Sequence, residues 1–195
     1  GLYSLKQRLD VPLLLNVGVS LPTGSINRKD DTLAGPNTNL PYPMQLGSGT
    51  VDFLPGLTYA DKKAQLSWGG QIRSTLRFGH NEYKYRLGNR YELTSWLAYT
   101  WDEWISSSFR IKASKWDQIA GADPRLNPNM VPTADPDKRG GERIDLLLGV
   151  NLMAHHGFLE GHRLALEFGF PVYQNLTCPQ LGVGLHGTLG WQKAF

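Results

Sequence analysis

Charged side chains recur at every second position of several segments, where they alternate with large apolar residues. Arg110 and Lys112, for example, are interleaved with Phe109, Ile111 and Ala113. Eleven charged residues hold such positions, seven basic and four acidic, which leaves a balance of +3. They are Asp52, Arg73, Arg77, Arg90, Glu92, Arg110, Lys112, Arg143, Asp145, Arg163 and Glu167. On one shared face, these groups either pair to hold a narrow interior rigid or, through their basic excess, attract small anions.

His186 falls on the same predicted face and raises the question of hydrolysis. That chemistry needs a serine within reach of a histidine that a third group orients. Ser106 and Ser108 are the serines on this face that could serve. Serine is abundant in the sequence, so the set carries little weight, and we predict no catalytic residue.

Asp123-Pro124 and Asp135-Pro136-Asp137 raise the question of a calcium site. Ca²⁺ takes several oxygen ligands, but Asp and Pro are also common turn residues. Because the spacing matches no calcium loop, we predict no metal and no cofactor.

The composition favours a β protein with many turns. The 195 residues include 22 Gly and 12 Pro, and only 19% are charged, against about 25% in ordinary soluble domains. The sequence contains no run of 18 apolar residues, so no transmembrane helix is predicted. Cys178 is the single cysteine of the chain, which excludes a disulfide framework. The scattered net charge of +3 gives no support for nucleic-acid binding.

Alternation of apolar and polar residues predicts eight strands, because successive side chains of a strand point to opposite faces. The strands are expected at 13–19, 51–59, 66–78, 91–101, 105–113, 144–152, 164–172 and 181–195. The last exceeds the ~9–11 residues that a tilted membrane strand needs. Pro55 predicts a bulge or a misplaced strand, and Trp96 departs from the alternation.

Longer and shorter connections alternate along the chain. Residues 21–48 and 115–142 form long connections, whereas Asp102–Glu103 is a tight one. Transmembrane barrels have longer extracellular loops and short periplasmic turns. We therefore predict one domain over 1–195, an all-β, antiparallel up-and-down transmembrane β-barrel of about eight strands. Its candidate lumen-lining residues are Arg73, Arg77, Glu92, Arg110, Lys112, Asp145, Arg163, Glu167 and His186.

Aromatic residues fall near the predicted strand ends, as in the girdles of membrane barrels. On the inferred periplasmic side they are Tyr59, Trp68, Trp101, Trp104, Trp191 and Phe195, and on the outer side Phe78, Tyr91 and Tyr173.

A soluble lipocalin-like barrel that binds a ligand would show the same alternation with the faces exchanged. Its polar face would be rich in charge, whereas here that face is mostly Gly, Ser, Thr and Gln. The membrane barrel is therefore favoured. The lipocalin-like binder and, less favoured, an outer-membrane lipid hydrolase remain the alternatives.

Several segments also carry a family resemblance. They are Leu21–Ser25, Leu40–Gly49 with Pro55–Tyr59, Tyr85–Gly88, Val131–Asp137 and Gly161–Glu167. With them, nearly the whole chain resembles a family of bacterial outer-membrane barrels described as transporters and related to the proteins of the meta-pathway of phenol degradation. Gly187–Phe195 resembles the C-terminal assembly signal of such barrels.

The resemblance implies a porin-like role in the outer membrane of a Gram-negative bacterium: passage or binding of a small solute, contact with outer-membrane lipid, and recognition of Phe195 by the barrel assembly machinery. It assigns no functional residue. Family members look longer at the N-terminus, so residues 1–10 are expected to be the tail of a preceding strand and its turn. The chain would then be the C-terminal part of a barrel of about twelve strands.

Overall fold

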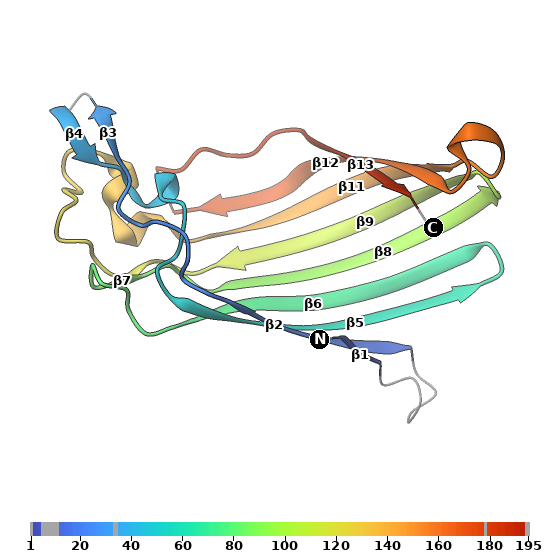
Figure 1. Cartoon of the computed structure of the whole chain (residues 1–195), viewed down its shortest axis with the longest axis horizontal. Helices are drawn as coiled ribbons and strands as arrows, with labels where there is room; N and C mark the ends of the chain where they lie inside the picture. Colours follow the sequence, from blue (N-terminus) through green and yellow to red (C-terminus); the bar gives the residue numbers. More distant parts are fainter. Residues whose placement is uncertain (1, 5–11, 33–34, 178, 194–195) are drawn as a thin grey trace.

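A computed structural model describes residues 2–4, 12–32, 35–177 and 179–193. It is dominated by one curved antiparallel sheet, with long loops gathered at one end and short turns at the other (Figure 1). The nine strands lie in the order β1-β2-β5-β6-β8-β9-β11-β12-β13. Their bounds are β1 Leu2–Ser4, β2 Leu13–Ser20, β5 Val51–Lys63, β6 Leu66–Phe78, β8 Arg90–Asp102, β9 Ile105–Trp116, β11 Gly141–Met153, β12 His162–Leu176 and β13 His186–Lys193. Neighbours in the sheet follow one another along the chain, so the predicted all-β, up-and-down fold is confirmed.

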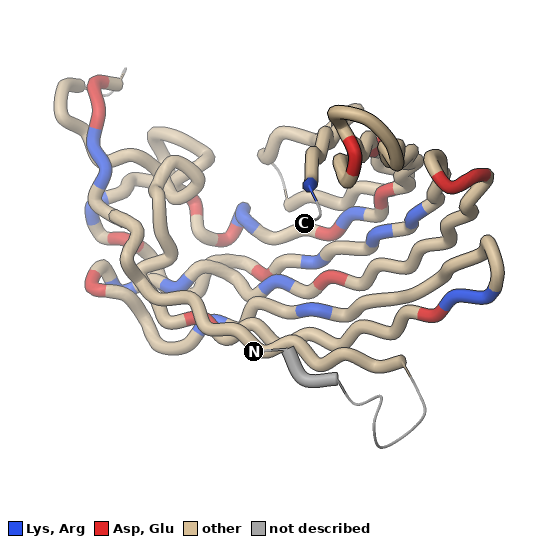
Figure 2. The backbone as a smooth tube through the Cα atoms, turned by 45° about the vertical axis from the view of Figure 1, so that its right-hand side comes forward, with Lys and Arg blue, Asp and Glu red and all other residues tan. Residues whose placement is uncertain are grey.

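Period-two alternation gives the sheet two unlike faces. Outward positions at mid-strand, such as Ile72, Leu148 and Phe168, are large, apolar and more than half exposed. Figure 2 shows basic and acidic positions on neighbouring strands of the same sheet. A lipocalin-like barrel would bury its apolar face around a ligand and turn its polar face to water. The structure has the opposite arrangement.

The position of the bulge in the sheet differs from the prediction. β5 continues through Pro55 with the same register to β6 on both sides, so neither the predicted bulge nor a misplaced strand is present. Pro55 lies opposite Val17 on β2, and the bridges to β6 resume at Gly56. A real bulge lies instead between β11 and β12, where Ile144 pairs with Tyr173 and Asp145 with Pro171. The extra residue is Val172 on β12, and its insertion places Tyr173 on the outer face, opposite Ile144.

The last strand is shorter than predicted. β13 begins at His186, and its pairing with β12 ends where His186 meets Gly169. Two residues further along β12, Pro171 has no N–H to continue the ladder. Beyond that point the Gln174 side chain takes over, because its amide donates to the Val183 carbonyl (2.8 Å) and accepts from the Val183 N–H (3.0 Å).

The two edges of the sheet are β1 and β13. β1 pairs with β2 and β13 with β12, and within the described part of the chain neither has a partner on its other side, so the ring is open there. No described helix is both long and apolar enough to cross a membrane.

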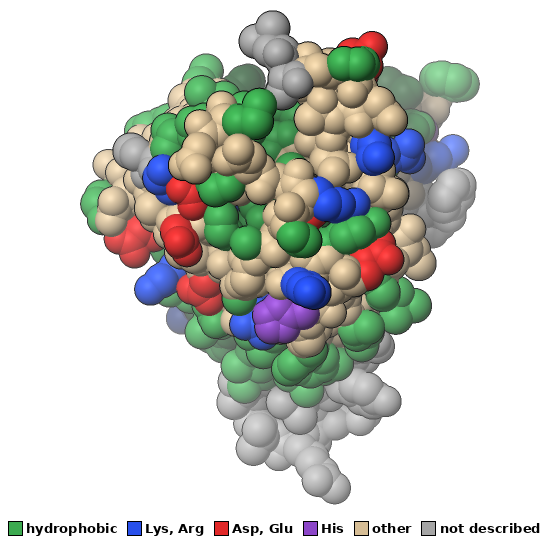
Figure 3. Space-filling model, turned by 90° about the vertical axis from the view of Figure 1, so that its left-hand side faces the viewer, with side chains coloured by type: hydrophobic (Ala, Val, Ile, Leu, Met, Phe, Trp, Pro, Cys, Tyr) green, Lys and Arg blue, Asp and Glu red, His purple; other side chains and the backbone are tan. Residues whose placement is uncertain are grey.

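The long loops pack together into a cap, defined here as the described parts of residues 21–50, 79–89 and 117–140. It contains two small sheets, β3 (Lys29–Thr32) with β4 (Gly35–Asn39) and β7 (Tyr85–Arg86) with β10 (Ala120–Gly121). Three 3-10 turns lie here as well, η1 Tyr42–Met44, η2 Pro132–Ala134 and η3 Pro136–Lys138, and a fourth, η4 Gly157–Leu159, lies at the opposite end. Seen end-on, the cap mixes charged, polar and apolar side chains (Figure 3).

Candidate functional site

The polar face of the sheet borders a partly open cavity of 630 Å³. Residues of six consecutive strands, β6 to β13, line this one cavity, which requires the sheet to curl around it. We call this concave surface, formed by the inward positions of β5 to β13, the trough. Small polar residues dominate its lining: Ser67, Gln71, Thr94, Thr100, Ser106, Ser108, Asn151 and Thr188. Trp96 also lines it and covers Gly69 on the neighbouring strand, so it fits the alternation as an inward residue.

The predicted lumen charges form ion pairs across the trough. Glu92 on β8 receives Arg73 from β6 and Lys112 from β9, the latter with Nζ to Oε1 at 3.0 Å. Arg110 on β9 reaches Glu167 on β12 (3.1 Å) across β11, which carries Gly149 opposite Glu167. These pairs join residues of four strands and reach across β11, which lies between β9 and β12.

Two further pairs lie nearer the cap. Arg77 contacts Asp52 at 3.4 Å, and Arg143 contacts the buried Asp145 at 3.0 Å. All four inward carboxylates therefore have a basic partner. Among the described residues, Arg90 and Arg163 have no carboxylate within ion-pair distance, although Arg163 donates to Asn151 Oδ1 (2.6 Å).

His186 does not meet the serines considered for hydrolysis. Its ring covers Gly169 on β12, and its buried Nδ1 lacks a hydrogen-bond partner. Ser108 lies on β9, three strands away, which is about 14 Å along the sheet at the usual strand spacing. Ser106 lies two residues nearer the opposite end of β9, so the set is not assembled.

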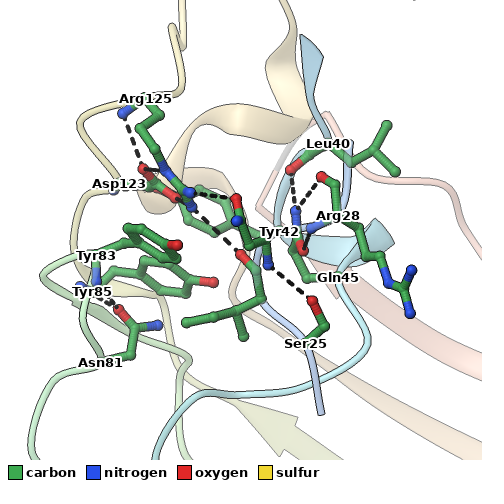
Figure 4. A network of polar contacts seen from close by, with 12 residues as sticks. Ser25, Arg28, Leu40, Tyr42, Gln45, Asn81, Tyr83, Tyr85, Asp123 and Arg125 are labelled. Carbon is green, nitrogen blue, oxygen red and sulfur yellow. Dashed lines mark hydrogen bonds and ion pairs between the residues drawn. The ribbon is translucent and has the colours of Figure 1, made fainter. Parts of the chain in front are cut away.

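The cap holds a polar network that the alternation could not reveal (Figure 4). Arg125 clasps the buried Asp123 with two bonds, Nε to Oδ1 at 2.9 Å and Nη2 to Oδ2 at 2.6 Å. The Asp123 N–H donates to the Tyr42 hydroxyl (3.0 Å), and the Arg125 guanidinium stacks 3.1 Å above the Tyr83 ring. Tyr42 packs edge-on against Tyr85.

The pKa values of the titratable groups in the cap are shifted by burial in some cases and by ion pairs in others. Desolvation raises the pKa of Tyr85 to about 12, and it also raises the pKa of Tyr42. The hydrogen bond to Asp123 raises the pKa of Arg125 above its ordinary value. The carboxylate of Asp123 is thus paired with an arginine. Asp135 forms an ion pair with Lys138, and the hydrogen bond from Lys138 lowers the pKa of Asp135. In the described residues no cluster of three or more His, Cys, Asp or Glu side chains could hold a metal.

The predicted girdle aromatics fall at two opposite ends of the strands. Trp101 and Trp104 lie at the tight turn between β8 and β9, and their indole N–H groups donate to Ser107 Oγ (2.9 Å) and Asp102 Oδ2 (3.1 Å). Trp191 donates to His162 Nδ1 at the same end (3.0 Å). Tyr59 and Trp68 lie towards this end, whereas Phe78, Tyr91 and Tyr173 lie towards the cap. Phe195 lies outside the described residues.

No model of a known protein family and no curated protein sequence matches the chain. Among solved structures, an outer membrane channel from Pseudomonas putida F1 has the same fold, with a TM-score of 0.61 at 13% sequence identity. The match covers 96% of this chain and 60% of the channel, so the chain spans about 60% of that protein's length. At this identity the likeness concerns the fold.

Proposed function

We propose that the chain forms wall and cap of an outer-membrane channel through which small solutes pass passively, with a weak preference for anions. The observation that carries this proposal is the pairing of a polar cavity lined by six strands with an exposed apolar outer face. In lipid, an apolar surface costs nothing to expose, and an antiparallel sheet satisfies its own backbone once its two edges are paired. The fold of the Pseudomonas channel supports the same function.

The preference for anions rests on the charges of the trough. Seven basic residues face four acidic ones, and each acid already has a basic partner. The surplus positive charge raises the local concentration of anions in a cavity with low-dielectric walls. A small anionic solute is therefore the favoured cargo, and a small hydrophobic solute is the alternative.

The membrane also sets a condition on the edges β1 and β13. An unpaired edge cannot face hydrocarbon, so in the membrane each edge must pair with another strand. The family resemblance suggests that additional strands complete a larger ring. It also suggests kinship with the barrels related to the meta-pathway of phenol degradation and recognition of Phe195 by the assembly machinery.

The test is a conductance measurement in planar lipid bilayers under a KCl gradient, on the protein inserted with both edges of the sheet paired. We expect ion flow with a reversal potential of the sign for chloride preference. Arg110→Glu should move that potential towards cation preference, whereas Arg28→Glu, an equal change in an exposed loop residue, should leave it unchanged. A monodisperse protein that folds without detergent, or a folded membrane-inserted protein that passes no ions, would overturn the proposal.

A further inference from the structure

A separate cavity of 320 Å³ lies where the trough meets the cap. Four connections contribute to it, the three loops of the cap and the segment after β12, together with the ends of β6, β8 and β9. The lining residues are Tyr42, Pro43, Arg77, Leu87, Gly88, Arg90, Trp116, Asp117, Ile119, Arg139 and Gln180. This volume is at the small end of the range for ligand pockets.

The strand ends supply two arginines and an indole. Arg90 on β8 is directly opposite Trp116 on β9, and both side chains face the trough. Arg77 on β6 is held by Asp52 and donates to the Gly88 carbonyl. Arg90 has no carboxylate partner among the described residues, so its charge is available to a ligand.

The cap supplies a third arginine in a fixed position. The backbone N–H groups of Arg139 and Gly140 both donate to the side-chain oxygen of Gln118, at 2.7 and 2.5 Å. The Arg139 side chain is half-buried, and no described carboxylate lies within ion-pair distance of it. Burial alone lowers its pKa from the ordinary value, yet an arginine remains charged at neutral pH. A half-buried cation without a counterion loses part of its hydration, and an anion would offset that partial cost.

The rest of the lining is apolar or aromatic. Tyr42 is buried against the cap cluster, and Ile119 and Leu87 pack beside it. Asp117 is the acidic residue of the lining, and Asp52 neutralises Arg77, so three guanidinium groups against two carboxylates leave a positive balance. The cavity thus combines a cationic side with an apolar side.

We propose that this cavity binds a small organic monocarboxylate with an apolar body. The carboxylate would contact Arg90 and Arg139, whose planar guanidinium groups suit a carboxylate, and the apolar body would lie against Trp116 and Tyr42. This inference deepens the proposed function, on which it rests for its role as a binding step at the mouth of the channel. The binding itself does not require conduction.

The test is titration calorimetry of the full chain folded in detergent, with benzoate as the probe. Benzyl alcohol supplies the ring without the charge, and acetate supplies the charge without the ring. We expect benzoate to bind at least tenfold more tightly than either. Arg139→Gln and Arg90→Gln should each weaken benzoate at least tenfold.

Arg28→Gln is the matched control, because it removes an exposed cap charge whose side chain points away from the network (Figure 4). It should leave benzoate binding unchanged. Absence of benzoate binding to the folded chain, or equal binding of benzyl alcohol, would overturn the inference. So would equal losses in all three variants. Because bilayer conductance is measured without benzoate, a failure here is distinct from a failure of the channel proposal.

Discussion

The ion pairs of the trough and those of the cap differ in how far they are exposed to solvent. In the trough, Glu92 is shared between Arg73 and Lys112, and the side chains of all three remain partly exposed to the cavity. In the cap, Asp123 is only 4% exposed, and one arginine covers it with two hydrogen bonds. A solvated pair contributes little to stability, whereas a buried one is costly to break. The trough is thus suited to tuning a solute path, and the cap to holding loops in one arrangement.

The largest expected effect concerns the outer face of the trough wall. Leu97 and Ala98 are neighbours on β8, with Leu97 outward and half-exposed and Ala98 lining the cavity. Leu97→Arg should destabilise the membrane-inserted protein by about 2–4 kcal/mol, because it places a charge in lipid. Ala98→Arg should be tolerated. Urea unfolding in lipid vesicles measures both, and equal losses would break the distinction between the faces.

In the cap, Asp123→Ala should release the loops while the strands stay paired. The change leaves Arg125 without its partner and removes the acceptor side of the network, at a cost of about 2 kcal/mol to the cap alone. Hydrogen exchange should then rise across residues 81–89 and 119–126 but not in β8 or β9. Asp135→Ala, which removes a more exposed carboxylate, is the control, and a uniform rise over the whole sheet would contradict the local character of the cap.

The sequence predicts the trough better than the cap, because the strands of the trough have a regular period and the loops of the cap have none. Residues such as Leu148 and Asp145 alternate along a strand, so a period of two predicted their opposite faces before any contact was known. The cap has no period, and its contacts join residues far apart in the chain, such as Tyr42 and Asp123. Asp123 beside Pro124 indicated a turn, with a calcium site as the less favoured alternative, and did not indicate a partner in another loop. The short β13 was missed because Leu181, Val183 and Leu185 continue the alternation where β12 offers no further backbone partners.

A smaller effect is expected from Glu92→Gln in the trough. Loss of this carboxylate frees Arg73 and Lys112, while stability should change by less than about 1 kcal/mol because the pairs are partly solvated. The reversal potential of the channel should move further towards chloride. Glu142→Gln, which removes a carboxylate bonded to Tyr173 on the outer face, should not move it.

The smallest effect is a dependence of the cap on high pH. The pKa of Tyr85 is raised from 10.0 to about 12 by burial. The neutral phenol is therefore favoured in the closed cap, so its contribution is complete below pH 10 and is lost as the pH rises towards 12. The ultraviolet absorbance of tyrosinate, taken as the difference between the protein and Tyr85→Phe, should therefore rise near pH 12 and not near pH 10. A difference that is already complete near pH 10 would contradict the assignment.

The central claim is that the apolar face of the strands lies in lipid and the polar face lines a water-filled interior. Spin labels placed singly along β9, from Ile105 to Ala113, in a Cys178→Ser background test it in lipid vesicles by electron paramagnetic resonance. The account predicts that accessibility to oxygen peaks at the odd positions and accessibility to a water-soluble nickel reagent at the even ones. The reverse phase, or no alternation, would contradict it.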